Sequence, residues 1–156
     1  MKAVRLFAWA AVFALVALAG YQFLTQDENV STLPGGPFTL TAHTGAKVSD
    51  KDFRGKFMLV YFGYSYCPDV CRIELHKLTT ALTMLEKDGY DLSEVQPLFI
   101  TVDPERDTVA ELAEYVKDYH PSLIALTGTL GEIEDVAMTY KVYYAKRVEE
   151  AYEGYL

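Results

Sequence analysis

The chain has 156 residues, 51% of them apolar, with a formal net charge of −8 and an isoelectric point near 4.8. This length suits one domain and a targeting segment but not two full domains, and the apolar content argues against a disordered chain. The acidic charge and the lack of a run of Lys and Arg argue against nucleic acid as a partner, because phosphate binding needs a basic patch.

The first 26 residues are expected to be a targeting segment. Lys2 and Arg5 precede an uncharged stretch over residues 6–26, which is long enough to cross a bilayer as a helix. Positive charge on its N-terminal side predicts a cytoplasmic N-terminus and an exported domain. We favour an uncleaved signal anchor, because the uncharged stretch is long for a signal peptide. A cleaved peptide is the alternative, since residues 17–19 (Ala-Leu-Ala) resemble a cleavage site.

A polar linker is expected over residues 27–36, followed by one domain over residues 37–156 in which strands and helices alternate. The expected elements, in chain order, are a hairpin over 38–49, a strand over 57–64, a helix from Pro68 to Gly89, a strand over 95–102, a helix capped by Thr108, a strand over 123–126, a helix capped by Thr129 and a strand that begins at 142. This order predicts an α/β domain with a mostly parallel sheet covered on both faces. The continuously apolar strand over 57–64 is expected to be central and buried on both faces.

Cys67 and Cys71 are the only cysteines, and both follow the strand that is expected to be central. Their close spacing favours redox chemistry or metal binding over a structural bridge, because short loops gain little from a disulfide. In a helix that starts at Pro68, both sulfurs lie at the positive end, which favours thiolate. The spacing of four residues predicts that both cysteines share one face of this helix, with their Cβ atoms about 5–6 Å apart. This distance is wider than the ~4 Å of a disulfide. Two thiolates on one soft ion fit readily, with Cu(I) favoured and Zn(II) as competitor.

The alternative is that Cys71 is a small core residue. It falls in one helical stripe with Leu75, Leu78 and Leu82. A second cysteine at the start of the same helix is hard to explain by packing alone.

Five stretches of the chain resemble the Sco/SenC family of copper-handling proteins with a thioredoxin fold, over a region from Gly36 to Tyr155. They are Val60–Tyr64, Cys67–Cys71, Thr101–Thr108, His120–Gly128 and Lys141–Tyr144. The Cys-Pro-x-x-Cys motif is only fairly specific by itself, but its combination with the Val-Asp-Pro-Glu-Arg-Asp-Thr string is very specific. Arg72 departs from the family pattern, which usually has a second proline there.

The resemblance implies a thioredoxin-like domain in which Cys67 and Cys71 bind one copper ion together with a histidine, and also act as a redox pair. It implies copper delivery to the Cu(A) site of cytochrome c oxidase subunit II, reduction of that site's cysteines, or both. Other periplasmic thiol or copper proteins are further partners to expect. Asp103 matches an acidic residue near the family's site, and the alternative is a turn cap before Pro104. The implied location is the inner (cytoplasmic) membrane, as a single-pass protein with its cysteine domain facing the periplasm.

The family's histidine ligand lies in a later strand, so we expect the third ligand beyond Leu156, and the family's final strand and helix are missing from this sequence. His76 is expected to face away from both cysteines round the helix. His43 and His120 are expected to be surface or structural residues. We assign none of the three as a ligand.

Two functions compete on these observations. The first is a copper chaperone or assembly factor rather than a classical enzyme, and the second is a metal-independent, membrane-anchored thiol–disulfide oxidoreductase. A peroxidase-type thiol protein is less favoured, because no proton-accepting group is marked out beside one attacking cysteine.

Overall fold

The computed structural model describes residues 9, 12, 14–18, 34–149 and 152–155. The chain divides into two units, residues 1–33 and 34–156. The described residues of the first unit are helical. No helix within the described residues is both long and apolar enough to span a bilayer. Most of the predicted anchor and linker lies outside the described residues.

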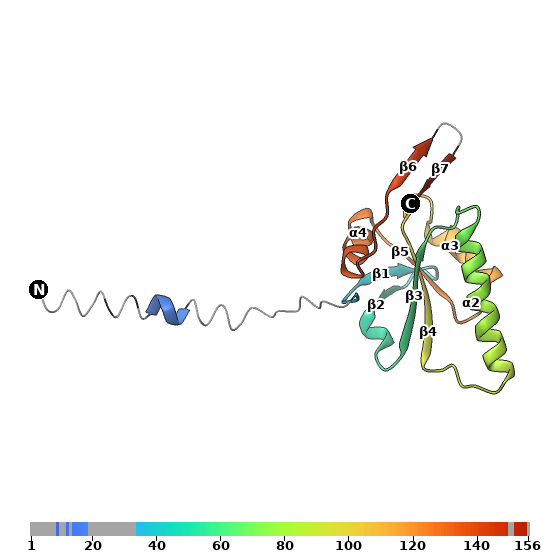
Figure 1. Cartoon of the computed structure of the whole chain (residues 1–156), viewed down its shortest axis with the longest axis horizontal. Coiled ribbons are helices and arrows are strands. Elements are labelled where there is room, and N and C mark those ends of the chain that lie inside the picture. The colour runs from blue at the N-terminus through green and yellow to red at the C-terminus, as the bar shows by residue number, and fades with distance from the viewer. Residues whose placement is uncertain (1–8, 10–11, 13, 19–33, 150–151, 156) are drawn as a thin grey trace, which may run out of the picture. The chain divides into compact units, whose positions relative to one another are not determined.

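The second unit is built on a mixed five-stranded sheet with the strand order β2-β1-β5-β4-β3 (Figure 1). The strands are β1 (Thr39–Ala42), β2 (Lys47–Ser49), β3 (Phe57–Gly63), β4 (Val95–Thr101) and β5 (Ile124–Thr127). Strands β3, β4 and β5 run parallel, whereas β1 runs antiparallel to both β2 and β5. The predicted hairpin is confirmed, whereas the sheet is mixed and not mostly parallel, with two parallel and two antiparallel strand pairs.

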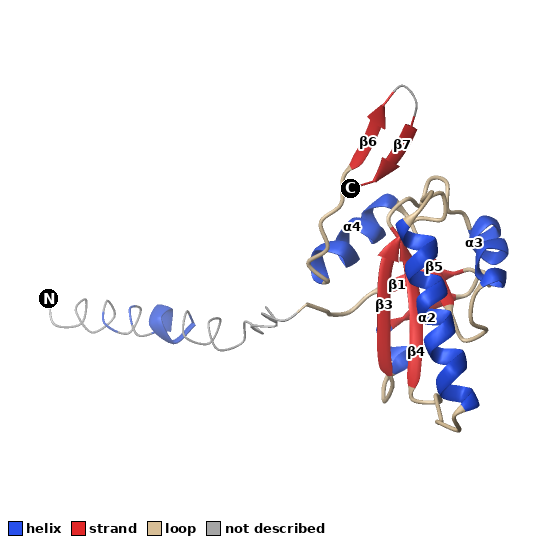
Figure 2. Ribbon diagram, turned by 45° about the vertical axis from the view of Figure 1, so that its right-hand side comes forward, coloured by secondary structure: helices blue, strands red, loops and turns tan. Residues whose placement is uncertain are grey.

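Helices cover both faces of this sheet (Figure 2). They are α2 (Val70–Lys87), α3 (Val109–Tyr115) and α4 (Leu130–Thr139), with the short 3-10 helices η1 (Asp50–Phe53) and η2 (Val116–Asp118). The two faces follow from the alternation of side chains along β4. Leu98 and Ile100 pack with η1 and α4, whereas Phe99 packs with α2 and α3.

The helix boundaries follow the local signals in the sequence. Thr129 and Glu132 form the predicted capping box of α4, in which Thr129 Oγ1 accepts the Glu132 N–H and the Glu132 carboxylate accepts the Thr129 N–H. Thr108 Oγ1 accepts the Glu111 N–H at the start of α3. Gly89 follows α2 with φ of 85°, a left-handed conformation that favours glycine.

Two strand predictions were wrong. Strand β3 lies at the edge of the five-stranded sheet and not at its centre, and Phe57 and Leu59 are exposed. Met58, Val60 and Phe62 are partly buried against one apolar layer, whereas Phe57 and Leu59 on the opposite face are exposed, so the predicted burial on both faces was also wrong. A continuous apolar pattern does not reveal whether a strand has one neighbour or two. Residues 142–145 form a loop, and strand β6 (Lys146–Glu149) begins only after it, pairing with β7 (Tyr152–Tyr155) in a separate two-stranded sheet.

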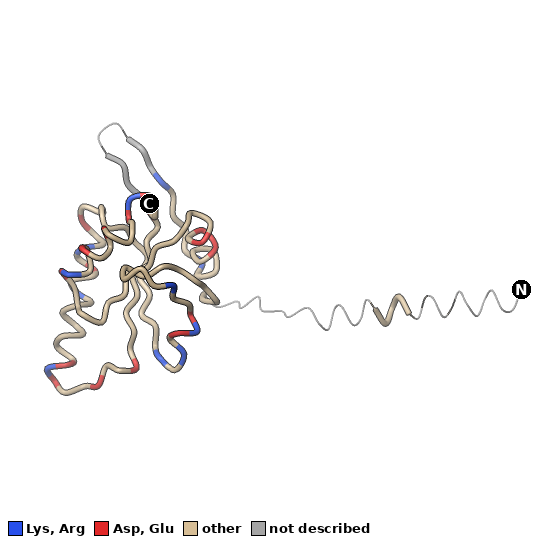
Figure 3. Tube along the Cα trace, turned by 180° about the vertical axis from the view of Figure 1, so that it is seen from behind, with Lys and Arg blue, Asp and Glu red and all other residues tan. Residues whose placement is uncertain are grey.

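Charged positions of both signs are interspersed over the described part of the second unit (Figure 3). Several form ion pairs at the surface, including Lys47 with Glu132 and Lys77 with Glu74. Exposed pairs of this kind stabilise a fold only slightly. The fold therefore depends mainly on its two apolar layers.

Candidate metal and redox site

The two cysteines lie at the carboxyl end of β3, where that strand passes into α2. Both side chains are only 5% exposed, and both are free thiols. They form a small apolar cluster with Tyr64 and Val102, which follow the ends of β3 and β4. The site thus lies where parallel α/β sheets usually bind their ligands.

The local geometry differs from the prediction at the start of the helix. Helix α2 begins at Val70 with Asp69 as its N-cap, so Pro68 is not the first helical residue. Cys67 lies in the preceding turn, where its N–H donates to the carbonyl of Tyr64 at 3.2 Å. The expected sharing of one helical face by Cys67 and Cys71 was therefore wrong, because the turn and not the helix sets the position of Cys67.

The turn nevertheless brings the Cys67 sulfur to the N-terminus of α2. Burial raises the pKa of the Cys67 thiol, but donors around the sulfur outweigh burial and lower it below its usual value. These donors are the backbone N–H groups of Cys71 and Asp69, the Cys71 thiol and the Tyr64 hydroxyl. Each stabilises the anion, so Cys67 is the residue of the pair that favours thiolate.

Cys71 has the opposite character. Burial raises the pKa of its thiol, and so does the hydrogen bond in which it serves as donor to Cys67. The Tyr64 backbone N–H and the Tyr61 hydroxyl act against this rise without cancelling it. Burial together with the contact to Cys71 also raises the pKa of Tyr61, so its hydroxyl keeps its proton. The two thiols are thus unequal, because the surroundings favour the thiolate at Cys67 and the protonated thiol at Cys71.

Gly63 provides the space for Cys71 at the end of β3. A Cβ at this position would lie 3.0 Å from the Cys71 Sγ, 3.0 Å from a Tyr61 ring carbon and 3.1 Å from a Phe99 ring carbon. The Gly63 carbonyl also accepts the Val102 N–H at 2.8 Å, which joins the ends of β3 and β4. Any larger residue must push apart the groups that fix the Cys71 sulfur.

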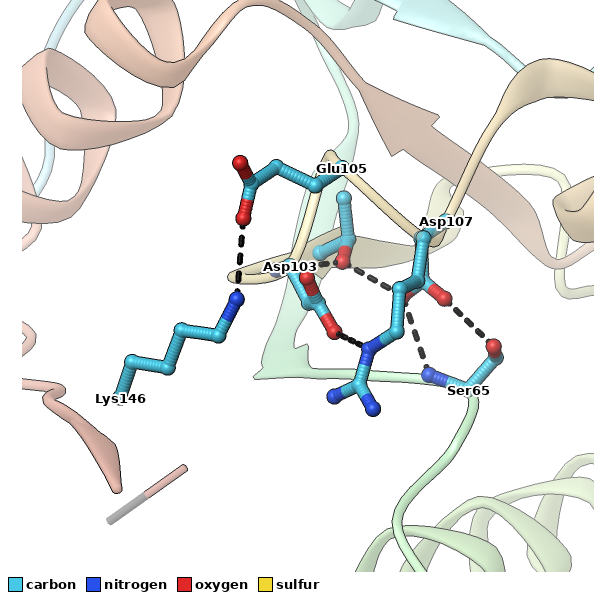
Figure 4. A network of polar contacts seen from close by, with 7 residues as sticks. Ser65, Asp103, Glu105, Asp107 and Lys146 are labelled. Atoms are coloured by element: carbon cyan, nitrogen blue, oxygen red, sulfur yellow. Dashed lines mark hydrogen bonds and ion pairs between the residues drawn. The ribbon is translucent and has the colours of Figure 1, made fainter. Parts of the chain in front are cut away.

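A loop after β4 supports the site with buried polar contacts (Figure 4). Asp103 is fully buried and forms an ion pair with Arg106. The Asp103 carbonyl accepts the N–H groups of Arg106 and Asp107, at 3.2 and 2.9 Å. Its turn role is therefore present in the structure, whereas a role of Asp103 toward a metal remains a prediction.

Asp107 is a site residue that the sequence reasoning missed. Its fully buried carboxylate accepts hydrogen bonds from Ser65 and from Thr101. Burial raises the pKa of Asp107 above its usual value, although these three hydrogen bonds act to lower it. The sequence feature that could have identified Asp107 is its position within the Val-Asp-Pro-Glu-Arg-Asp-Thr string, because that string links two buried segments.

The three histidines occupy different environments. His43 Nδ1 accepts the Ala125 N–H at 3.2 Å, and His120 is buried beside Ser122 and Glu86. His76 is exposed on α2, with its ring against Tyr119. In the part of the chain that the structure describes, no group of three or more His, Cys, Asp or Glu side chains is placed to hold a metal ion.

An open groove gives access to the cysteine pair from one side. Cys67 lines it together with Tyr66, Arg72 and Tyr115. Cys71 is not among its lining residues and lies deeper, against Gly63. A partner would therefore meet the thiolate-favouring sulfur first.

The mixed sheet, its two helical layers and the paired cysteines define a thioredoxin-like α/β domain with a dithiol site. The chain belongs to the SCO1/SenC family, whose model matches residues 26–156. It is 45% identical over 124 residues to the mitochondrial SCO1 homologue of Homo sapiens, a match that covers 80% of this chain and 41% of that protein. The chain thus spans about two fifths of that relative's length.

Two solved structures share this fold and contain copper. The copper-bound ScoI of Arabidopsis thaliana is 46% identical, with a TM-score of 0.71, and the match covers 78% of this chain and 74% of that one. The copper-bound ScoI of Bradyrhizobium japonicum is 39% identical, with a TM-score of 0.72, and the match covers 78% and 76%. The family resemblance and the thioredoxin-like fold are therefore confirmed.

Replacement of Gly63 by alanine should displace Cys71 and destabilise the domain. Overpacking of this kind costs about 1–3 kcal/mol, measured as the free energy of unfolding in urea. Gly131→Ala is the matched control, because a Cβ there has nothing within 4 Å. That substitution in α4 should be neutral or slightly stabilising. Equal stability of Gly63→Ala and the wild type would contradict this account of the site.

The lowered pKa of Cys67 predicts a specific pH dependence. With Cys71→Ser as background, the rate of alkylation of Cys67 by iodoacetamide should rise with pH and level off below the pH range of an ordinary thiol. Tyr64→Phe removes a donor to the sulfur and should move this profile to higher pH. Tyr66→Phe is the control, because that ring is half exposed. Identical profiles for the two tyrosine variants would show that the Tyr64 hydroxyl does not stabilise the thiolate.

Proposed function

We propose that this chain is a copper-binding assembly factor that delivers copper to the Cu(A) site of cytochrome c oxidase subunit II, reduces the cysteines of that site, or does both. The observation that carries this proposal is the buried, reduced pair of Cys67 and Cys71, whose sulfurs are joined by a hydrogen bond. The copper-bound structures of two relatives support it.

The donor set suits monovalent copper as cargo. Soft thiolates select Cu(I). Two thiolates on one Cu(I) leave a net negative charge, and in a site from which water is largely excluded this charge needs the hydrogen-bond donors around the sulfurs. Cys67 is already disposed to be anionic, whereas Cys71 must release its proton when the ion binds. The Tyr61 and Tyr64 hydroxyls then remain as donors to the two sulfurs, and such hydrogen bonds tune a metal site. The open side at Cys67 gives cargo and partner a route to the pair.

A metal-independent thiol–disulfide oxidoreductase is the second candidate, and the opposite pKa shifts of the two thiols favour it. The Cys67 thiolate would attack a partner's disulfide and form a mixed disulfide, with one partner sulfur leaving as thiolate. Cys71 would lose its proton and attack Cys67, which closes the Cys67–Cys71 bond and releases the second partner thiolate. The chain is oxidised by two electrons in this reaction and needs an external thiol reductant to return.

Titration of the reduced chain with Cu(I) against a competing chelator should give one ion per chain. Cys67→Ser and Cys71→Ser should each weaken binding by more than about tenfold, because the loss of a ligand costs at least as much as the loss of an outer hydrogen-bond partner. Met138→Leu is the control for adventitious soft-ligand binding, since that thioether is 68% exposed. Unchanged affinity in either serine variant would reject the copper proposal and leave the oxidoreductase.

We also propose that residues 1–26 anchor the chain in the inner membrane, that residues 27–36 are a linker, and that the domain over 37–156 faces the periplasm. The charge pattern supports this topology, because Lys2 and Arg5 precede the uncharged stretch and the first acids, Asp27 and Glu28, follow it.

A bacterial alkaline phosphatase fused after Leu156 should be active, because this enzyme matures only when exported. The same fusion without residues 1–26 should be inactive, and the full fusion should sediment with membranes if the segment remains as an anchor. A purely cytoplasmic reporter enzyme that is fully active at the same position would contradict the topology.

A further inference from the structure

The segment that connects β3 to the cysteine pair is held by a single buried carboxylate. Asp107 Oδ2 accepts the Ser65 N–H at 3.0 Å, and Asp107 Oδ1 accepts the Ser65 hydroxyl at 2.5 Å. The Thr101 hydroxyl, at the end of β4, donates to Oδ2 at 2.5 Å. All three residues are buried, and Figure 4 shows Ser65 and Asp107 facing each other. One carboxylate thus joins the turn before Cys67 to the buried strand β4.

The same loop also contacts both neighbours of Ser65. The Arg106 guanidinium lies 5.9 Å from the ring centroid of Tyr64 and 5.1 Å from that of Tyr66, within the range of cation–π contacts. The loop itself is fixed to β4, because the Asp103 N–H donates to Thr101 Oγ1 at 2.9 Å. Three consecutive residues are therefore held from a loop about forty positions away in the sequence.

Tyr64, the first of these three residues, contacts both sulfurs. Tyr64 supplies its hydroxyl to Cys67 and its N–H to Cys71, and its carbonyl accepts the Cys67 N–H. Strand β3 ends at Gly63 and helix α2 begins at Val70, so neither element's own hydrogen bonds position Ser65. Its position depends on the contacts from the loop after β4.

We propose that Asp107 is the positioning residue of the cysteine pair, which holds Ser65 on β4 so that the donors of the turn and of α2 reach the Cys67 sulfur. It acts through geometry and not through charge. An asparagine can keep the same contacts: its carbonyl oxygen accepts the Ser65 N–H and the Thr101 hydroxyl, and its amide donates to Ser65 Oγ. An alanine keeps none of them.

The test compares Asp107→Ala, Asp107→Asn and Ser65→Ala in the full chain. The primary readout is the reduction potential of the Cys67–Cys71 couple in glutathione buffers, which involves no copper. Loss of the donors around Cys67 destabilises the reduced form of the pair. In Asp107→Ala the equilibrium constant should therefore shift toward the disulfide by about tenfold, which is the effect of one hydrogen bond to a charged group. This shift makes the reduction potential about 30 mV more negative. The equilibrium constant of Asp107→Asn should stay within about twofold of the wild-type value. The reduction potential of Ser65→Ala should become more negative, but by less than that of Asp107→Ala.

Asp91→Ala is the matched control. Its carboxylate accepts the N–H and the hydroxyl of Ser93 at 2.8 and 2.9 Å, in an exposed loop after α2. This variant should leave the potential unchanged. Cu(I) affinity, measured in parallel, should fall about tenfold in Asp107→Ala. That second measurement rests on the proposed function, so absent copper binding in the wild type would reject the copper proposal while the potential still decides the role of Asp107.

Three results would overturn the positioning role. A lower thermal midpoint of Asp107→Ala with an unchanged potential would make Asp107 a purely structural residue. A shift in Asp107→Asn as large as in Asp107→Ala would mean that charge and not geometry acts. If Asp107→Ala does not fold, an unchanged potential in Ser65→Ala decides against the proposal.

Discussion

The sulfur of Cys67 is removed from water, and yet its surroundings favour the anion. A buried charge is costly unless hydrogen bonds replace those lost from water. Here the replacement comes from the N–H groups at the start of α2, the Cys71 thiol and the Tyr64 hydroxyl. Each donor lies on a different part of the turn or helix, so all of them reach the sulfur only if the turn is held in one position.

The remaining architecture can be understood from this requirement. The parallel strands β3 and β4 place the turn and the loop at residues 103–107 side by side at one end of the sheet. Gly63 allows Cys71 to pack directly on the end of β3, and the Asp107 carboxylate fixes the other side of the turn. The apolar layers above and below the sheet provide a rigid support, and such support keeps reactive groups in position. The site is thus a product of long-range packing more than of the five-residue motif.

Much of the fold could be predicted from the sequence, because its signals are local. The hairpin over 38–49, the caps at Thr108 and Thr129 and the buried strand β4 follow from turn residues, capping side chains and apolar patterns. The edge position of β3 could not be predicted, since strand order depends on contacts between distant segments. The start of α2 was misplaced because proline suits the first helical position but does not require it. The loop at residues 142–145 was mistaken for a strand because a short apolar run fits both.

The site was predicted only at its centre. Cys67 and Cys71 stand out by type and spacing, whereas Ser65, Gly63 and Asp107 act through contacts that no local pattern reveals. Asp103 was placed near the site by resemblance, and the structure gives it an ion pair with Arg106 and a turn. Residues that position a reactive group are ordinary in type, so only the three-dimensional arrangement identifies them.

Both proposed functions use the sulfurs of Cys67 and Cys71, and the copper proposal requires both of them as ligands. X-ray absorption at the copper edge of the Cu(I)-loaded chain tests the central claim most directly, because it reports which elements surround the ion. The account predicts that each copper has two sulfur neighbours, and that one of them is lost in Cys67→Ser and one in Cys71→Ser. Copper surrounded only by nitrogen or oxygen, or an unchanged spectrum in either variant, would contradict it.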